Sequence, residues 1–166
     1  MNEYKMLFDY HTHTTFSHGK GSIEDNVKEA VKKGLKAIAI TDHGPGHMTY
    51  GIKREDVPVM RAEIERLKPL YPQIEIYLGV EANIIDTGNN LDVTSEEIPQ
   101  YDFILAGYHF GIRECYSAAN FMYSHGIGTG AKRTAFLKER NTKMVVKAIE
   151  ENNIKILTHP GDKAPV

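Results

Sequence analysis

Histidines and a single glutamate end most of the apolar runs of this chain. Imidazole nitrogens and carboxylate oxygens bind Zn²⁺, Mn²⁺ and Fe ions in proteins. None of these positions is a cysteine, which excludes a structural zinc knuckle, and six or more ligands exceed what one tetrahedral ion needs. The pattern therefore predicts a cluster of two or three divalent ions (Zn, Mn or Fe). The residues that end the runs are His11, His13, His43, Glu81, His109 and His159.

Each apolar run is short and rich in Ile, Leu, Val, Phe or Tyr, which predicts a β-strand. Helical patterns over residues 22–34, 54–70 and 131–151 separate several of the runs. Strands that alternate with helices predict a parallel sheet with right-handed crossovers. Because the carboxyl ends of such strands lie at one edge, the ligands are expected to meet there. The predicted strands are residues 5–10, 35–41, 74–80, 101–107 and 155–158.

The first predicted strand carries Asp9, His11 and His13 at alternate positions. Side chains two residues apart in a strand share a face, so the two histidines are expected to bind one ion. Asp9, on the same face, is expected to orient one of the rings. His18 follows in a Gly/Ser-rich loop, from which it can reach the same cavity.

Four other loop residues are candidates for different roles. Lys20 and Arg113 are the cations that we predict to contact a phosphate group, with ordinary solvated surface charge as the alternative. His47 and His125 lie in glycine-rich loops and end no strand. For these two histidines we predict a structural role or a substrate contact rather than metal ligation.

Two stretches between strands lack a clear period. Residues 83–92 are interpreted as a hairpin-like excursion. Residues 110–130 form a long segment with several glycines, which is typical of a functional lid. The helix predicted after it, over residues 131–151, could form in one piece or two.

Length and composition restrict the class of protein. The 166 residues suffice for one domain with a sizeable core, and 41% hydrophobic residues are ordinary for a globular protein. A net charge of −2 without a basic track disfavours long nucleic acid as a partner. No apolar run reaches membrane-spanning length, and no signal peptide is recognised. The single cysteine, Cys115, excludes an internal disulfide and predicts a cytoplasmic location.

Taken in order, these motifs resemble those of the PHP (polymerase and histidinol phosphatase) superfamily of metal-dependent phosphoesterases. The resemblance implies an α/β fold, a distorted (β/α)7 TIM-like barrel of the PHP type with a trinuclear metal site. Residues 1–166 would be the N-terminal portion of one PHP domain and would supply its first five β/α units. The matching pieces are residues 9–14, His18, 40–44, 79–83, 106–109 and 158–161.

The resemblance also implies three groups of metal ligands, with Glu81 as a bridge between two ions. The family's closing motif, an Asp and a His two residues apart, has no counterpart after His159. We therefore expect a missing C-terminal barrel segment to associate with this chain, or the chain to self-associate. The implied groups are His11, His13 and Glu81; Glu81, His109 and His159; and His18 with His43.

The function implied by the resemblance is hydrolysis of small phosphate monoesters, of the histidinol-phosphatase type. The attacking group would be a hydroxide that the ions generate from water. Two alternatives stay open from the residues alone. One is a phosphodiesterase or nuclease that acts on nucleotides or DNA ends, and the other is a metal-binding PHP module without catalytic activity.

Overall fold

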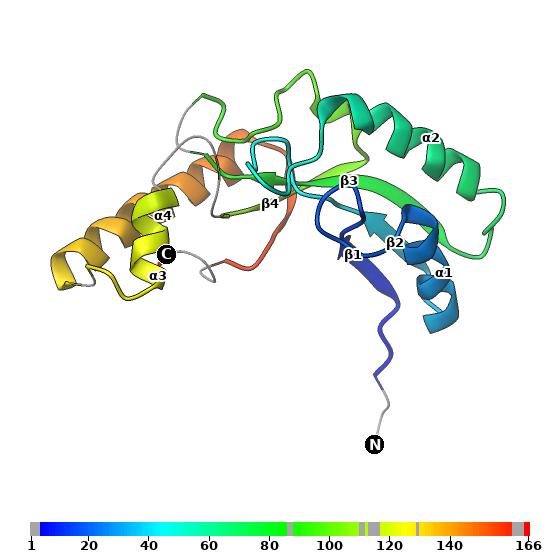
Figure 1. Ribbon diagram of the computed structural model, residues 1–166, viewed down its shortest axis with the longest axis horizontal. Coiled ribbons are helices and arrows are strands. Elements are labelled where there is room, and N and C mark those ends of the chain that lie inside the picture. Colours follow the sequence, from blue (N-terminus) through cyan, green and yellow to red (C-terminus); the bar gives the residue numbers. More distant parts are fainter. Residues whose placement is uncertain (1–3, 86–87, 110–111, 113–116, 129, 161–164) are drawn as a thin grey trace.

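The computed structural model describes residues 4–85, 88–109, 112, 117–128, 130–160 and 165–166. Within these ranges the chain forms one curved sheet of five parallel strands in the chain order β1-β2-β3-β4-β5 (Figure 1). The five strands and their parallel direction agree with the sequence prediction, and the seven-stranded barrel remains a prediction. The strands are β1 Phe8–Thr12, β2 Ala37–Ile40, β3 Glu75–Asn83, β4 Phe103–Gly107 and β5 Ile154–Leu157.

Four α-helices connect or flank the strands in the described ranges. Figure 1 shows α1 and α2 beside one half of the sheet, and α3 with α4 beside the other. Residues from α1 and α2, such as Val27 and Ile64, share a core cluster with Ile38 and Leu78 of the sheet. The helices are α1 Ile23–Lys33, α2 Val57–Leu67, α3 Ser117–Ser124 and α4 Ala131–Glu151, with short 3₁₀ turns at Arg54–Asp56 and Ile98–Gln100.

The ends of α1 follow from local sequence. The Ser22 side chain accepts a hydrogen bond from the Asp25 backbone N–H, and the Asp25 carboxylate accepts one from the Ser22 backbone N–H. This reciprocal cap contributes on the order of 1 kcal/mol to helix stability. Gly34 ends the helix with φ of 71°, a left-handed conformation that glycine adopts without steric cost. The chain then enters β2 directly.

The apolar face of α2 begins with the first residue of the helix. Val57, Met60, Ile64 and Leu67 are buried, whereas Val59 is 56% exposed. The helix begins at Val57, so its buried residues follow at i, i+3, i+7 and i+10, and Val59 points to solvent.

The segment predicted as an irregular lid contains a helix. Residues 110–130 include α3, which packs against α4, and α4 is one continuous helix. A helix of only eight residues gives little periodicity, so the tertiary contact with α4 decides its formation. No helix in the described ranges is both long and apolar enough to cross a membrane.

Candidate metal centre

Glu81 is fully buried near the carboxyl end of β3, where its two oxygens meet different imidazoles. Oε1 lies 2.8 Å from Nε2 of His159, 3.2 Å from Nε2 of His11 and 3.3 Å from Nε2 of His109. These histidines follow or belong to β5, β1 and β4, so parallel strands bring them to one edge of the sheet. The predicted meeting of strand-end side chains is therefore found in the structure.

The other oxygen of Glu81 faces a second group of rings. Oε2 lies 3.0 Å from Nδ1 of His43 and 3.5 Å from Nε2 of His13. The ring of His18 lies 4.6 Å from that of His13 and 4.9 Å from that of His43, measured between centroids. All seven residues predicted as ligands thus lie in one cluster around Glu81.

A bulge in β1 turns the histidines toward this cluster. Phe8 pairs with Ala37, Asp9 with Ile38, and Thr12 with Ile40, so β1 carries one extra residue between the last two pairs. Strict alternation is therefore broken between Asp9 and Thr12. The Asp9 carboxylate accepts a hydrogen bond from the backbone N–H of His11 at 3.3 Å, and its role in orienting a ring stays a prediction.

Asp42 fixes the loop that carries His18. Its fully buried carboxylate accepts hydrogen bonds from the Thr14 N–H and O–H, both at 2.6 Å, and from the Ser17 O–H at 2.7 Å. The loop is thereby attached to the end of β2, where His43 follows directly. The sequence shows the Asp-His pair, but only the tertiary structure reveals that the aspartate acts on a segment 28 residues away.

The environment of His109 and His159 is crowded and partly strained. A Cβ on Gly107 would lie 2.9 Å from Cε1 of His109 and 3.0 Å from Cε1 of His159, so the rings need glycine there. His159 adopts φ of 29°, which is uncommon outside glycine. Strained backbone of this kind is frequent at functional sites, where the surrounding structure enforces it.

The protonation states of the cluster suit metal binding. Burial alone would raise the pKa of Glu81, but the imidazoles around its two oxygens, that of His109 above all, outweigh burial and lower the pKa well below its usual range. Burial lowers the pKa of His13 to about 3, with a contribution from the nearby His43, and burial also lowers the pKa of His109. At neutral pH Glu81 is therefore ionised and the His13 and His109 rings are neutral, the forms that bind metal ions.

The donor set fits divalent cations. Nδ1 of His43 and Oε2 of Glu81 lie 3.0 Å apart, and like Nδ1 of His13 they are buried atoms without a well-directed hydrogen bond in the described part of the chain. Buried polar atoms are costly without partners, and a cation held between them would remove that cost. Three sets of ligand-type atoms lie within 4.8 Å of one another: His13, His18 and His43; His11, His13 and Glu81; and His43, Glu81 and His109.

The two predicted phosphate contacts have different outcomes. Lys20 is exposed in the loop after His18, and the structure gives it no hydrogen bond or ion pair with the residues it describes. Arg113 lies outside the described residues. Both substrate contacts stay predictions.

His47 lies closer to the centre than its place in a glycine-rich loop indicated. Its ring is 5.3 Å from that of His43, and its Nδ1 accepts hydrogen bonds from the N–H groups of Thr49 and Tyr50. Burial and the neighbouring His43 lower the pKa of His47 to about 4. The ring is therefore neutral with its proton on Nε2. His125, by contrast, packs on Phe121 of α3.

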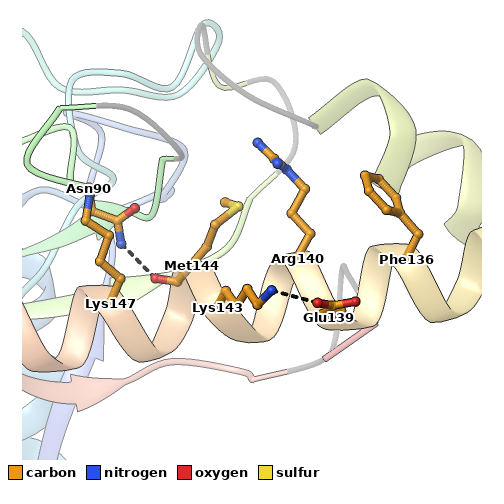
Figure 2. A pocket seen from close by; sticks show the side chains of 7 residues that line it. All are labelled: Asn90, Phe136, Glu139, Arg140, Lys143, Met144 and Lys147. Atoms are coloured by element: carbon orange, nitrogen blue, oxygen red, sulfur yellow. Dashed lines mark hydrogen bonds and ion pairs between the residues drawn. The ribbon is translucent and has the colours of Figure 1, made fainter.

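A separate cavity of about 290 Å³ lies along α4 (Figure 2). Figure 2 shows Asn90, from the excursion after β3, with its side-chain amide directed at the backbone of Met144, whose carbonyl it donates to at 2.7 Å. None of the seven predicted ligands lines this cavity. Its lining residues are Asn90, Phe136, Glu139, Arg140, Lys143, Met144 and Lys147.

Comparison with known proteins adds relatives that are about twice as long. The chain is 32% identical over 164 residues to a protein named probable phosphatase from Thermoanaerobacter sp. strain X514, covering 95% of this chain and 55% of the relative. Proteins of the same name from Caldanaerobacter subterraneus and Shewanella sediminis are each 31% identical, covering 95% and 96% of this chain and 53% and 55% of the relatives. The chain thus spans about half the length of these curated relatives.

A solved structure and a family profile complete the comparison. The crystal structure of a histidinol phosphate phosphatase from Lactococcus lactis, in complex with zinc, L-histidinol and phosphate, gives a TM-score of 0.44 at 22% identity. That match covers 64% of this chain and 41% of the solved one. The PHP domain profile matches residues 9–158, a span from the start of the β1 motif to the residue before His159. On this match and on its curated relatives, the chain belongs to the PHP domain family.

Proposed function

We propose that residues 1–166 are the N-terminal portion of a PHP phosphoesterase that hydrolyses phosphate monoesters at a centre of two or three divalent ions. The observation that carries this proposal is the buried Glu81 carboxylate, with five imidazoles within 3.5 Å of its oxygens. Divalent ions at such a centre supply a water of lowered pKa and neutralise charge on a phosphate ester. The name phosphatase of the curated relatives supports the same class of substrate.

Glu81, the imidazoles around it and His47 have different roles in the proposed centre. Oε1 of Glu81 faces one group of histidines and Oε2 faces another, which supports a carboxylate that would be shared by two ions. Neutral imidazoles leave the positive charge of the ions uncancelled, and that charge remains available to a phosphate group. His47 would also help to bind a substrate. Two backbone N–H groups donate to its Nδ1, so its Nε2–H can donate a hydrogen bond to a phosphate oxygen.

The substrate would approach from the exposed side of the cluster. The His11 side chain is 35% exposed and that of His159 is 29% exposed, whereas Glu81 has no exposed surface. We assign to Lys20 and Arg113 the contacts with the substrate phosphate, in a cytoplasmic protein that acts on small phosphorylated molecules. A C-terminal barrel segment, or a second copy of this chain, would complete the ligand set.

The test combines metal analysis with two chromogenic esters. Elemental analysis of the folded chain after dialysis against Zn²⁺ or Mn²⁺ should give at least one tightly bound ion, and hydrolysis of p-nitrophenyl phosphate should exceed that of bis-p-nitrophenyl phosphate. Preference for the diester would favour a phosphodiesterase instead. A folded chain that binds neither metal would refute the proposal, and bound metal without turnover of either ester would favour a non-catalytic module.

A further inference from the structure

A buried carboxylate lies next to the metal centre without joining it. Asp92, at the end of the excursion after β3, is 9% exposed. Its Oδ1 accepts a hydrogen bond from the Asn83 backbone N–H at 2.7 Å, and its Oδ2 accepts one from the Gly46 backbone N–H at 2.7 Å. Oδ2 also accepts a hydrogen bond from the side-chain amide of Asn83. Three donors thus converge on this carboxylate, and the described residues provide it with no ion pair.

The donors and acceptors around Asn83 allow only one orientation of its amide. Burial raises the pKa of the Asp92 carboxyl, but each of its oxygens faces an N–H donor, so both oxygens accept and Asp92 requires the Nδ2 end of Asn83. The carbonyl oxygen of Gly44, 3.3 Å from Nδ2, requires the same end. The opposite end, Oδ1, then lies 2.7 Å from Nδ1 of His109.

This orientation determines where His109 carries its proton. Because Oδ1 of Asn83 accepts, Nδ1 of His109 must donate, and in a neutral ring the lone pair is then on Nε2. Nε2 is the atom that lies 3.3 Å from Oε1 of Glu81 and 3.2 Å from Nε2 of His159. We propose that Asp92 and Asn83 are positioning residues that fix the tautomer of His109 and direct its Nε2 lone pair at the metal ions. This inference rests on the metal centre of the proposed function.

Two glycines make room for the carboxylate. A Cβ on Gly44 would lie 2.5 Å from both oxygens of Asp92, and a Cβ on Gly46 would lie 2.7 Å from Cβ of Asp92. Neither distance is possible without displacing the aspartate. The loop after β2 is therefore shaped around Asp92, which supports a specific role for this carboxylate rather than incidental burial.

The excursion that carries Asp92 is also tied to α4. Asn90 donates to the carbonyl of Met144 at 2.7 Å (Figure 2), and the side-chain amide of Asn152 donates to the carbonyl of Asn89 at 3.2 Å. Within the excursion, the Asp92 N–H donates to the Asn83 carbonyl at 3.1 Å. The aspartate is thus held from both sides, as a group that orients another residue must be.

The test measures the His109 tautomer and zinc affinity separately. In Asp92→Asn, three donors would face an amide with a single acceptor oxygen, and reversal of the Asn83 amide relieves this conflict at the cost of its 3.3 Å hydrogen bond to the Gly44 carbonyl. Long-range ¹H–¹⁵N spectra of the metal-free protein should show protonated Nδ1 of His109 in the wild type and protonated Nε2 in Asp92→Asn. The His109 signals are assigned from their loss in His109→Ala. Competition with a chromophoric chelator should show zinc affinity reduced about 10- to 100-fold in Asp92→Asn and Asn83→Ala.

Matched variants control for general damage to the fold. Asp102→Asn changes a carboxylate that also accepts a strand N–H, from Leu78 at 2.7 Å, and Asn141→Ala removes a buried amide of α4. Both should keep the His109 tautomer and the wild-type zinc affinity. If Asn83→Ala does not fold, the isosteric Asp92→Asn decides.

Two results would overturn the inference, and both are distinct from failure of the proposed function. One is an unchanged His109 tautomer in Asp92→Asn, and the other is wild-type zinc affinity in the variants. A wild-type chain that binds no zinc would instead refute the proposed function. The spectra of the metal-free protein would still decide whether Asp92 and Asn83 set the tautomer.

Discussion

The two sides of the candidate centre differ in burial and in the way that the protein holds them. On the closed side, Glu81 is fully buried and His43 and His109 are each 7% exposed. On the open side, His11, His18 and His159 reach solvent. Preorganised ligands on one side and accessible ligands on the other are the arrangement expected of a centre that must bind ions and admit a substrate.

The closed side is built into the sheet. His43 and Glu81 form a parallel bridge, in which the Glu81 N–H donates to the Asp42 carbonyl at 3.0 Å and the Gly44 N–H donates to the Glu81 carbonyl at 2.8 Å. The open side depends on a loop and on the turn at the strained His159. The difference teaches that backbone hydrogen bonds of the sheet fix the buried carboxylate, whereas the side chain of Asp42 fixes the loop of the exposed His18.

The largest effect is expected for Glu81→Gln. This isosteric change removes the single carboxylate that both groups of histidines share, so zinc affinity should fall more than ~100-fold, beyond the range usual for residues that only support ligands. Competition with a chelator measures the loss, and circular dichroism checks the fold. Retention of wild-type zinc binding would show that the carboxylate is not the bridge between the two groups of histidines.

His109→Ala and His18→Ala compare the two sides directly. His109 is buried and hydrogen-bonded to Asn83, so its loss should reduce zinc affinity more than ~100-fold and abolish phosphatase activity while the fold persists. His18 is exposed, and its loss should cost only ~10-fold. Titration with zinc measures both. Equal losses would contradict the distinction between a closed and an open side.

The stability of the metal-free protein should depend on pH through its buried histidines. His13 and His47 have folded pKa values of about 3 and about 4, below the ~6.5 of an unfolded chain, so unfolding takes up protons between these limits. The free energy of unfolding of the metal-free protein should be highest above pH ~6.5 and should decline as the pH falls toward about 4. Urea denaturation across this range measures the decline, and His47→Gln should flatten it. A constant stability would contradict the neutral state of the rings.

The smallest effect is expected for Lys20→Ala. A lysine that contacts substrate phosphate on the open side should raise the KM for p-nitrophenyl phosphate several-fold and leave zinc affinity unchanged. Lys36→Ala is the matched control, because Lys36 is exposed just before β2, at the opposite edge of the sheet. If both variants behave alike, Lys20 is ordinary surface charge.

Much of the fold could be predicted from local patterns. Apolar runs located the five strands, the helical pattern over residues 22–34 located α1, and the strand ends located the candidate ligands. The errors arose where contacts distant in sequence override local signals. The alternation in β1 fails at a bulge set by pairing with β2, and α3 depends on packing against α4.

The supporting residues of the centre were beyond sequence reasoning for the same reason. Asp42 binds a loop 28 residues away, and Asp92 binds Gly46 across 46 residues. Neither aspartate differs in its local sequence from a solvated carboxylate. The proximity of His47 to His43 likewise comes from the path of a glycine-rich loop rather than from a strand end.

The sequence by itself determined which side chains gather at the centre, because residues at the carboxyl ends of parallel strands share one edge of a sheet. Only the tertiary structure decided how those side chains are oriented and protonated. Orientation depends on hydrogen bonds such as that from His109 to Asn83, and protonation depends on burial and on neighbouring charge. Both are properties of the packed chain, since they arise between segments that meet only when the protein folds.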